Sequence, residues 1–160
     1  MENFQIRTAE KKDAQLVLDF IKGIAAYEKM SGCVTATREI IEEFVFEKKA
    51  ASVFIGEWNG KPVGFALFFE NFSTFVGRTG IYLEDLFVLP EARGKGFGKK
   101  LFQAVAQEAV NRGCRRMEWT CLDWNQPSID FYLSMGAVPM SEWTNYRLSG
   151  EAIAEAAKKE

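Results

Sequence analysis

The pair Asn59-Gly60 restricts the fold more than any other short stretch of this sequence. It separates SVFIGEW from PVGFALFFE, two strand-like apolar runs, and Asn-Gly favours the tight turn that joins antiparallel strands. We therefore predict a hairpin over residues 52–70. A third strand is expected at residues 81–89, IYLEDLFVL, whose mostly apolar character places it in the centre of the sheet.

Helical periodicity surrounds these strands. Residues 13–29 predict a helix with Leu16, Phe20 and Ile24 on one face. A second helix is expected to start near Thr37, with a buried stripe made of Ile40, Ile41, Phe44 and Val45. A third is expected over residues 99–113, and its apolar face consists of Leu101, Val105 and Ala109.

The remaining elements complete the predicted fold. Further helices are expected at residues 126–137, which begin with Pro127 in the first turn, and at residues 151–160. Short strands are expected at residues 4–7, 115–122 and 143–150. The order of elements predicts a mixed α/β sandwich, in which helices flank a mixed, mostly antiparallel sheet.

At 160 residues the chain is expected to form a single domain, residues 1–160, with a core of its own. Apolar residues make up 48% and charged residues 26% of the sequence, the balance of a globular protein. A net charge of −2 gives no sign of a nucleic-acid partner. The amino-terminal residues lack a signal-peptide pattern, and no apolar run reaches the roughly 18 residues of a membrane span. We therefore expect a cytoplasmic protein without a membrane or nucleic-acid partner.

The sequence contains no histidine. This excludes Ser-His and Cys-His nucleophilic catalysis and the common histidine metal sites, so carboxylates, tyrosine, lysine and backbone amides remain as catalytic groups. Cys33, Cys114 and Cys121 form no CxxC pair and are expected to be reduced thiols rather than a disulfide framework or a zinc site. We expect no metal site.

Three glycines alternate in EARGKGFGKK, residues 91–100, between the third strand and the third helix. Their spacing fits neither the Walker A loop nor the GxGxxG dinucleotide fingerprint. Alternating glycines let successive N–H groups point into one concavity at the positive end of a helix, so the loop suits a pyrophosphate. Positive charge comes from Arg93, Lys95, Lys99 and Lys100. The alternative is a tight turn in which the glycines serve packing alone.

The RGxGxG motif, after LEDLFVLPEA and before a helix, resembles the acyl-CoA-binding motif of the GNAT N-acetyltransferase superfamily. IYLEDLFVLPEARGKGFGKKLF, WNQPSIDFY and AAYEKM are also similar to the diamine (spermidine/spermine) acetyltransferase branch, whose members include enzymes that act on thialysine. The similarity extends to about Leu148. It implies a GNAT-like fold, acetyl-CoA as cosubstrate, a homodimer, and direct acetyl transfer to a small primary amine.

The resemblance also implies roles for individual residues. The backbone that would pair with the pantetheine arm belongs to Leu86, Phe87 and Val88. The diphosphate would lie against Arg93, Gly94, Lys95, Gly96, Phe97, Gly98 and Lys99. Asn125 and Ser128 would hold the far side of the cofactor, and Tyr132 would protonate the departing thiolate. Contacts to the amine would come from Tyr27, Glu28, Glu84, Asp85 and Trp119, with Glu84 as the candidate base.

The reaction requires a neutral amine, and this is its hardest condition. An ammonium titrates near ~10.4 and a carboxylate near ~4.3, so direct proton transfer between unperturbed groups is uphill by roughly 8 kcal/mol. Burial of Glu84 in its apolar strand, the neighbouring Asp85 charge and a water relay are expected to help, giving a rate that rises into the alkaline range. The ordinary alternatives are a solvated acid pair, a plain helix end at Tyr27 and Glu28, and packing for Tyr132.

One departure from the resembled branch concerns the substrate. SEWTNYRL has Thr144 where polyamine acetylators carry a further acid, with Glu142 displaced by two positions. A shorter amine, including a lysine-like amino acid, is therefore as compatible as spermidine. Trp119, Trp143 and Tyr146 would form an aromatic wall, or alternatively lie in the core or in a dimer contact. A non-catalytic acyl-CoA sensor, an interaction module and a protein or peptide acetyltransferase are the other functions that the sequence allows.

Overall fold

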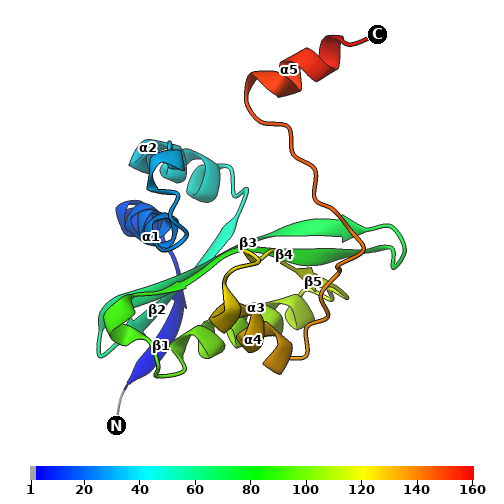
Figure 1. Cartoon of the computed structure of the whole chain (residues 1–160). Helices are drawn as coiled ribbons and strands as arrows, with labels where there is room; N and C mark the ends of the chain where they lie inside the picture. Colours follow the sequence, from blue (N-terminus) through cyan, green and yellow to red (C-terminus); the bar gives the residue numbers. More distant parts are fainter. Residues whose placement is uncertain (1–2) are drawn as a thin grey trace. The chain divides into compact units, whose positions relative to one another are not determined.

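The computed structural model describes residues 3–160 and divides into two compact units, one ending at Thr120 and one running from Cys121 to Glu160. The first unit contains the whole sheet and helices α1, α2 and α3 (Figure 1). Its strands are β1 (Phe4–Thr8), β2 (Ser52–Trp58), β3 (Lys61–Ser73), β4 (Arg78–Val88) and β5 (Met117–Glu118). The expectation of one domain over residues 1–160 stays a prediction.

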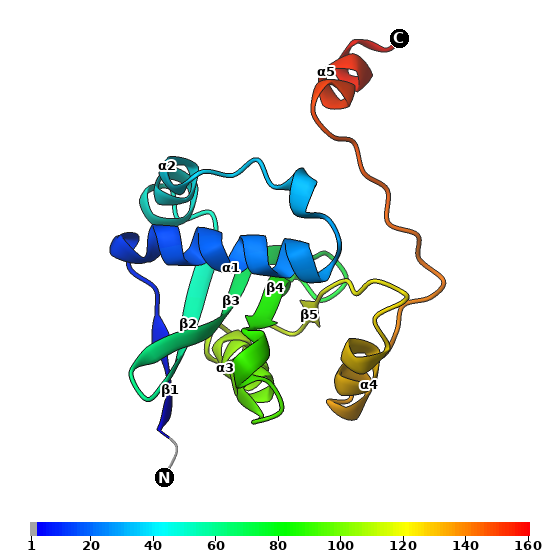
Figure 2. The same ribbon diagram turned by 60° about the vertical axis from the view of Figure 1, so that its left-hand side comes forward.

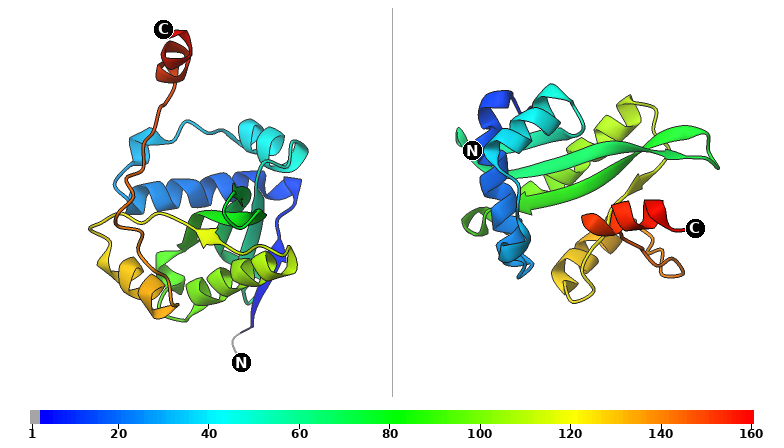
Figure 3. Two further views of the ribbon diagram at one scale, coloured as in Figure 1. Left: turned by 90° about the vertical axis from the view of Figure 1, so that its right-hand side faces the viewer. Right: turned by 90° about the horizontal axis from the view of Figure 1, so that it is seen from above.

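The five strands lie in the order β1-β2-β3-β4-β5, with every neighbouring pair antiparallel except β4 and β5. The predicted hairpin is confirmed, because β2 pairs with β3 and Asn59 and Gly60 both have positive φ values, 51° and 77°. β3 is the middle strand, and β4, predicted there, lies beside it. The tip of the long β3–β4 hairpin extends past the other strands (Figure 3).

Helices cover both faces of this sheet (Figures 1 and 2). On one face lie α1 (Ala14–Tyr27), which follows a 3-10 turn, and α2 (Arg38–Ile41); α3 (Phe97–Asn111) lies on the other. The core on the α1 face includes Val17, Phe20, Ile55, Phe65 and Phe87. All three residues predicted for the buried face of α3 are buried: Leu101, Val105 and Ala109. The mixed α/β fold with a mostly antiparallel sheet is confirmed.

The predicted second helix starts as expected but buries only part of the predicted stripe. Thr37 caps α2, since its side chain accepts a hydrogen bond from the Ile40 N–H. The chain then widens into a π-helix, Glu42–Glu47, whose larger turn rotates the following side chains relative to an α-helix. Ile41 is buried and Val45 packs partly buried against the α1 core, whereas Ile40 and Phe44 are exposed, so the predicted four-residue buried stripe is confirmed for two of its residues.

The second unit contains α4 (Gln126–Ser134) and α5 (Glu151–Lys158), which confirm the two predicted carboxyl-terminal helices. The strand predicted at residues 143–150 is wrong, since this segment has no strand in the structure. Its aromatic residues Trp143 and Tyr146 are 76% and 90% exposed, so neither is a core residue.

The strand predicted at residues 115–122 shortens to the two residues of β5. No helix within residues 3–160 is long and apolar enough to cross a bilayer.

Candidate active site

A β-bulge in β4 interrupts the pairing with β3. Leu67 is opposite Asp85, but the next residue, Phe68, is opposite Leu83, so Glu84 has no counterpart on β3. Glu84 is therefore the extra residue of the bulge. Bulges of this kind bend a strand and redirect its side chains, and they occur often beside active sites.

The bulge moves the buried side chains of β4 from one face of the sheet to the other. Asp85 shares the face of its partner Leu67, which belongs to the core beneath α1. Leu83 shares the opposite face with Phe68, the ring of which lies 5.5 Å from the guanidinium of Arg112 at the end of α3. Consequently the buried side chains of β4 that precede Glu84 pack on the α3 side of the sheet, and those that follow it pack on the α1 side.

Three carboxylates influence one another on the α1 side of the bulge. Glu28 is the residue that ends α1, and burial together with the charge of Glu84 raises its pKa. Burial also raises the pKa of Asp85 to about 7, with further contributions from Glu84 and Glu28. Such an acidic group is costly unless a cation neutralises it, which a protonated amine would do.

Of these three carboxylates, the more buried one is not the one that the sequence predicts. Glu84, expected to lie buried in its apolar strand, has an exposed side chain. Asp85 is half-buried instead, because the bulge turns it toward the apolar α1 face. Tyr27, also predicted to contact the amine, is next to Glu28 at the end of α1 and is 37% exposed.

The outer edge of β4 is open next to this acidic group. β5 pairs only with Ile81 and Tyr82, so within residues 3–160 no strand continues the ladder beside the carboxyl-terminal half of β4. The Leu89 N–H donates to the Val63 carbonyl on β3 at 2.8 Å. Alternation along an antiparallel pair then directs the backbone of Phe87 to β3 and that of Leu86 and Val88 to the open edge.

This geometry separates the three residues predicted to pair with pantetheine. Leu86 and Val88 have backbone groups at the open edge, where an extended amide-containing ligand would pair as an added strand does. The Phe87 backbone is not at this edge, because it pairs with β3. The Phe87 side chain belongs to the core and is 6% exposed. Leu86 and Val88 lie on either side of Phe87, because the direction of the backbone groups alternates with a period of two along a strand.

The glycine loop leads directly from this edge to the amino terminus of α3. Gly94 and Gly96 have φ values of 77° and 79°, and Gly96 is the residue that caps the helix. A Cβ atom built on either glycine would meet nothing within 4 Å. Both positions therefore require glycine for its backbone conformation. The alternative that the glycines serve packing alone is wrong for Gly94 and Gly96. Gly98 differs: its φ is not left-handed, and its Cβ would contact Val88 Cγ2 at 3.8 Å.

The loop has the properties of an anion site. The first turn of α3 contains no acidic residue, and the helix is 15 residues long, so its unpaired N–H groups present positive charge to the loop. Cationic side chains surround it: Arg93, Lys95, Lys99 and Lys100 are all exposed. Lys95 Nζ lies 4.8 Å from the centre of the Trp58 ring, and Lys100 Nζ lies 5.5 Å from that of Phe4. A diphosphate therefore fits this loop.

Two aromatic residues predicted for ligand contact pack against other rings of the first unit. The Phe97 ring stacks on Phe4, with centroids 4.2 Å apart, and is 3% exposed, so only its backbone is available to a ligand. Trp119 meets Phe102 of α3 edge-on at 5.2 Å. This contact places the Trp119 ring against α3, and its role at the amine stays a prediction.

The remaining predicted residues belong to the second unit. Asn125 is 7% exposed and caps α4, where its side chain accepts a hydrogen bond from the Ser128 N–H. Tyr132 is half-buried on the same helix, with its ring centroid 5.4 Å from that of Phe131. The cap explains why Asn125 and Ser128 occur three positions apart, independently of any cofactor.

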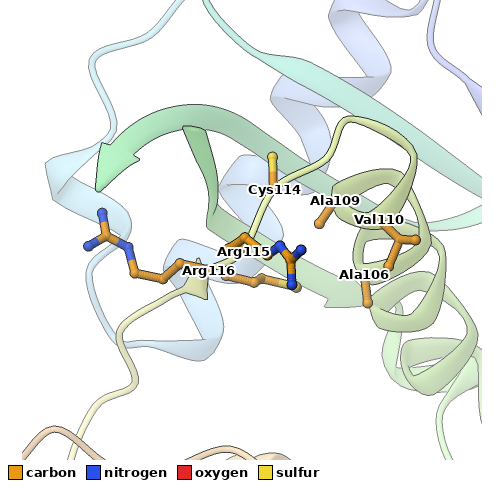
Figure 4. A pocket seen from close by; sticks show the side chains of 7 residues that line it. Ala106, Ala109, Val110, Cys114, Arg115 and Arg116 are labelled. Atoms are coloured by element: carbon orange, nitrogen blue, oxygen red, sulfur yellow. The ribbon is translucent and has the colours of Figure 1, made fainter. Parts of the chain in front are cut away.

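A separate, shallow and open pocket lies at the other end of α3 (Figure 4). It has a volume of about 290 Å³ and is lined by Ala106, Ala109, Val110, Cys114, Arg115, Arg116 and Met117. None of these is a predicted site residue, and no sequence motif marks them.

Within residues 3–160, no group of three or more histidine, cysteine or acidic side chains is arranged to hold a metal ion.

Comparison with known proteins identifies the family and the fold. The acetyltransferase (GNAT) family model matches residues 21–137, a range that includes the bulge, the glycine loop and α4. A thialysine N-epsilon-acetyltransferase from Sus scrofa is 36% identical over 171 aligned residues, covering 99% of this chain and 100% of the relative.

Solved structures show the same fold. An integron cassette protein from the mobile metagenome of V. cholerae superposes with a TM-score of 0.80 at 30% identity, over 98% of each chain. An aminoglycoside N-acetyltransferase, AAC(6')-Iy, solved in complex with CoA, has a TM-score of 0.74 at 21% identity and covers 92% of this chain and 96% of its own.

Proposed function

The chain belongs to the acetyltransferase (GNAT) family and is an N-acetyltransferase, and we propose that its acceptor is the primary amine of a small, lysine-like molecule. The observation that carries this proposal is the acidic group made of Glu28, Glu84 and Asp85, beside the open edge of β4. An ammonium group would neutralise these carboxylates. The thialysine N-epsilon-acetyltransferase that resembles the whole chain supports a lysine-like acceptor.

We propose that acetyl-CoA is the acyl donor. It supplies an acetyl thioester, the activated group of the reaction. The N–H groups of the loop between Arg93 and Gly98, at the amino terminus of α3, would bind its diphosphate. The backbone of Leu86 and the N–H of Val88, whose carbonyl accepts from Arg93, would pair with its amide-containing arm, which brings the thioester to the level of the bulge. Asn125 and Ser128 keep the supporting role that the resemblance implies.

The catalytic roles follow from the chemistry of the amine. A proton must leave the ammonium so that the nitrogen lone pair can attack the thioester, and Glu84 is proposed to act in this proton transfer through water. The departing thiolate needs a proton, which Tyr132 is proposed to donate from its phenol. Tyr27 and Glu28 would orient the acceptor from the end of α1.

The acceptor has a size limit in this proposal. A lysine-like amine places one ammonium at the acidic group. A long polyamine would need a further acid for its distant ammonium, and the chain has Thr144 at that point of the resembled pattern. Polyamines and diamines therefore remain second-choice acceptors. Homodimerisation and a cytoplasmic location stay predictions, as does the absence of a metal.

The experiment that tests the proposal is an acceptor panel. Purified protein and acetyl-CoA are incubated with thialysine, lysine, ornithine, spermidine and putrescine, and CoA release and acetylated product are both measured. We expect the highest kcat/KM for a lysine-like amine. Binding of CoA in calorimetry without turnover of any amine would favour the sensor. Acetylation of lysine residues in added peptides, with no small amine modified, would favour a protein acetyltransferase.

A further inference from the structure

The bulge in β4 gives two adjacent carboxylates different surroundings. Glu84 has no counterpart on β3 and its side chain is exposed, so water reaches it. Asp85 is half-buried and shares the α1 face with Leu67 and Phe87, two residues of the apolar core. A proton acceptor for an ammonium needs a basicity well above that of an ordinary carboxylate, and low solvation provides it.

We propose that Asp85 is the first acceptor of the proton from the substrate ammonium and that Glu84 passes this proton on to solvent. The inference rests on the acetyltransferase function proposed above. The geometry that points to it is the order of exposure across the bulge: an inner carboxylate on the apolar face, and directly beside it an outer carboxylate in water. Two such groups form a path from a partly dry site to bulk water.

The charged groups around Asp85 are consistent with this order. Glu84 from its own strand and Glu28 from the end of α1 both act on it, and with burial they raise its pKa to about 7. From β3, the opposite residue is the apolar Leu67. Arg93 comes from the glycine loop, where its guanidinium lies 5.0 Å from the centre of the Tyr27 ring and 5.4 Å from that of Phe87.

The proposed step is balanced in protons. Asp85 starts as a carboxylate and takes one proton from the ammonium, which leaves the nitrogen with its lone pair. That pair forms the N–C bond to the acetyl carbonyl carbon, and the C–S bond breaks toward sulfur. The second proton lost by the nitrogen balances the one that the thiolate gains, with Tyr132 as the intermediary. The first proton moves from Asp85 through Glu84 to water, so one proton is released for each acetyl transferred.

The test compares the pH dependence of kcat/KM for thialysine in the full chain and in three variants: Asp85→Asn, Glu84→Gln and, as a matched control, Asp19→Asn. Asp19 is an exposed residue of α1 whose carboxylate accepts a hydrogen bond from Gln15. For the unaltered protein we expect kcat/KM to rise to a bend near pH 7 and then level off until the amine itself titrates near pH ~10.4, in place of the rise into the alkaline range expected for Glu84 as the base.

The Asp85→Asn variant should lose the bend near pH 7 and about 100-fold of kcat/KM at pH 8, since only the neutral amine would then react. Glu84→Gln should keep the bend and lose less activity, and Asp19→Asn should match the unaltered protein. Calorimetry with CoA should give the same affinity for all four proteins. In CoA-free protein, a carbon NMR titration of the aspartate carboxyls should show one carboxyl that titrates near pH 7. This titration should be missing in Asp85→Asn.

Each contrary result has a separate meaning. If the unaltered protein acetylates thialysine but Asp85→Asn keeps the bend, or Glu84→Gln abolishes it, Asp85 is not the first acceptor. If the carboxyl that titrates near pH 7 persists in Asp85→Asn, the same conclusion follows without reference to activity. If CoA binds but no amine is acetylated by the unaltered protein, the proposed function itself fails, whatever the NMR titration shows.

Discussion

The Arg93 side chain donates a hydrogen bond from Nε to the Val88 carbonyl oxygen at 2.9 Å. Val88 ends β4 and Arg93 begins the glycine loop, so this bond links the open edge of the sheet to the anion site at α3. The same guanidinium lies against the rings of Tyr27 and Phe87. One side chain thus touches the strand end, the loop and the end of α1.

This relationship predicts the effect of Arg93→Met. The variant removes the guanidinium that would pair with a phosphate, and it leaves the Val88 carbonyl without its donor. We expect the Kd for CoA to rise about tenfold, equivalent to about 1.4 kcal/mol. Isothermal titration calorimetry at two salt concentrations is the measurement. Arg38→Met, at an exposed ion pair on α2, is the control and should leave the Kd unchanged. Equal affinities in all three proteins would contradict a role for Arg93 at the diphosphate.

The glycine loop predicts a difference between two alanine substitutions. Gly96→Ala places a Cβ at a φ of 79°, a conformation that costs about 1–2 kcal/mol for a residue other than glycine. We expect a lower free energy of unfolding and weaker CoA binding, because the N–H groups of the loop must reorient. Gly98→Ala adds a Cβ at an ordinary 3.8 Å from Val88 Cγ2 and should fold normally. Denaturant titration and calorimetry measure both effects, and equal behaviour of the two variants would refute this account.

Asp85 predicts a pH dependence of stability. Burial raises its pKa from an ordinary 3.8 to about 7 in the folded protein, so the folded state holds the proton more tightly than the unfolded state. Its contribution to stability is therefore complete below about pH 4 and is lost as the pH rises through 7. Asp85→Asn should raise the free energy of unfolding by about 1–3 kcal/mol at pH 8 and by much less at pH 5.

Urea unfolding at the two pH values measures this effect without any substrate or cofactor. Asp19→Asn should show no such difference between pH 5 and pH 8, since Asp19 is exposed. A stabilisation by Asp85→Asn that is the same at both pH values would mean that packing, rather than charge, is responsible.

Asp13 predicts the opposite pH dependence. It is 7% exposed, it accepts hydrogen bonds from Arg7 at 2.8 and 3.0 Å, and the Arg7 guanidinium lowers its pKa. This contribution is present above pH ~4 and is lost as the pH falls through the lowered pKa. Asp13→Asn should cost about 1–3 kcal/mol at pH 7, because charge-assisted hydrogen bonds are lost at a buried position.

The Asp13 effect should begin to shrink below pH ~4, where the unfolded chain takes up the proton, and it should vanish only once the pH falls through the lowered pKa of the folded state. Glu47→Gln is the matched control: its ion pair with Lys11 is exposed on both sides, and such pairs contribute little. Thermal and urea unfolding at pH 7 and pH 3.5 measure the comparison. A large loss in Glu47→Gln, or none in Asp13→Asn, would contradict this ranking by burial.

Local sequence determined the elements whose information lies within a few residues. Asn59-Gly60 predicted the hairpin, the periodicity around Leu101 predicted α3, and the alternating glycines predicted a turn that leads into a helix amino terminus. Each depends on backbone preference or on a single buried stripe, which neighbouring residues specify by themselves. The same local motif carries the family resemblance, so residues 91–100 suffice to predict a loop suited to a diphosphate.

Tertiary structure alone decided which acid is buried and which segments find partners. The bulge at Glu84 depends on the register between two strands, and a sequence of adjacent acids does not encode it. Residues 143–150 have strand-like residues but no strand in the structure, because a strand requires a partner that local preference does not supply. Phe97 and Trp119 belong to the packing of α3 for the same reason: contact with distant residues, and not their place in a motif, determined where their rings lie.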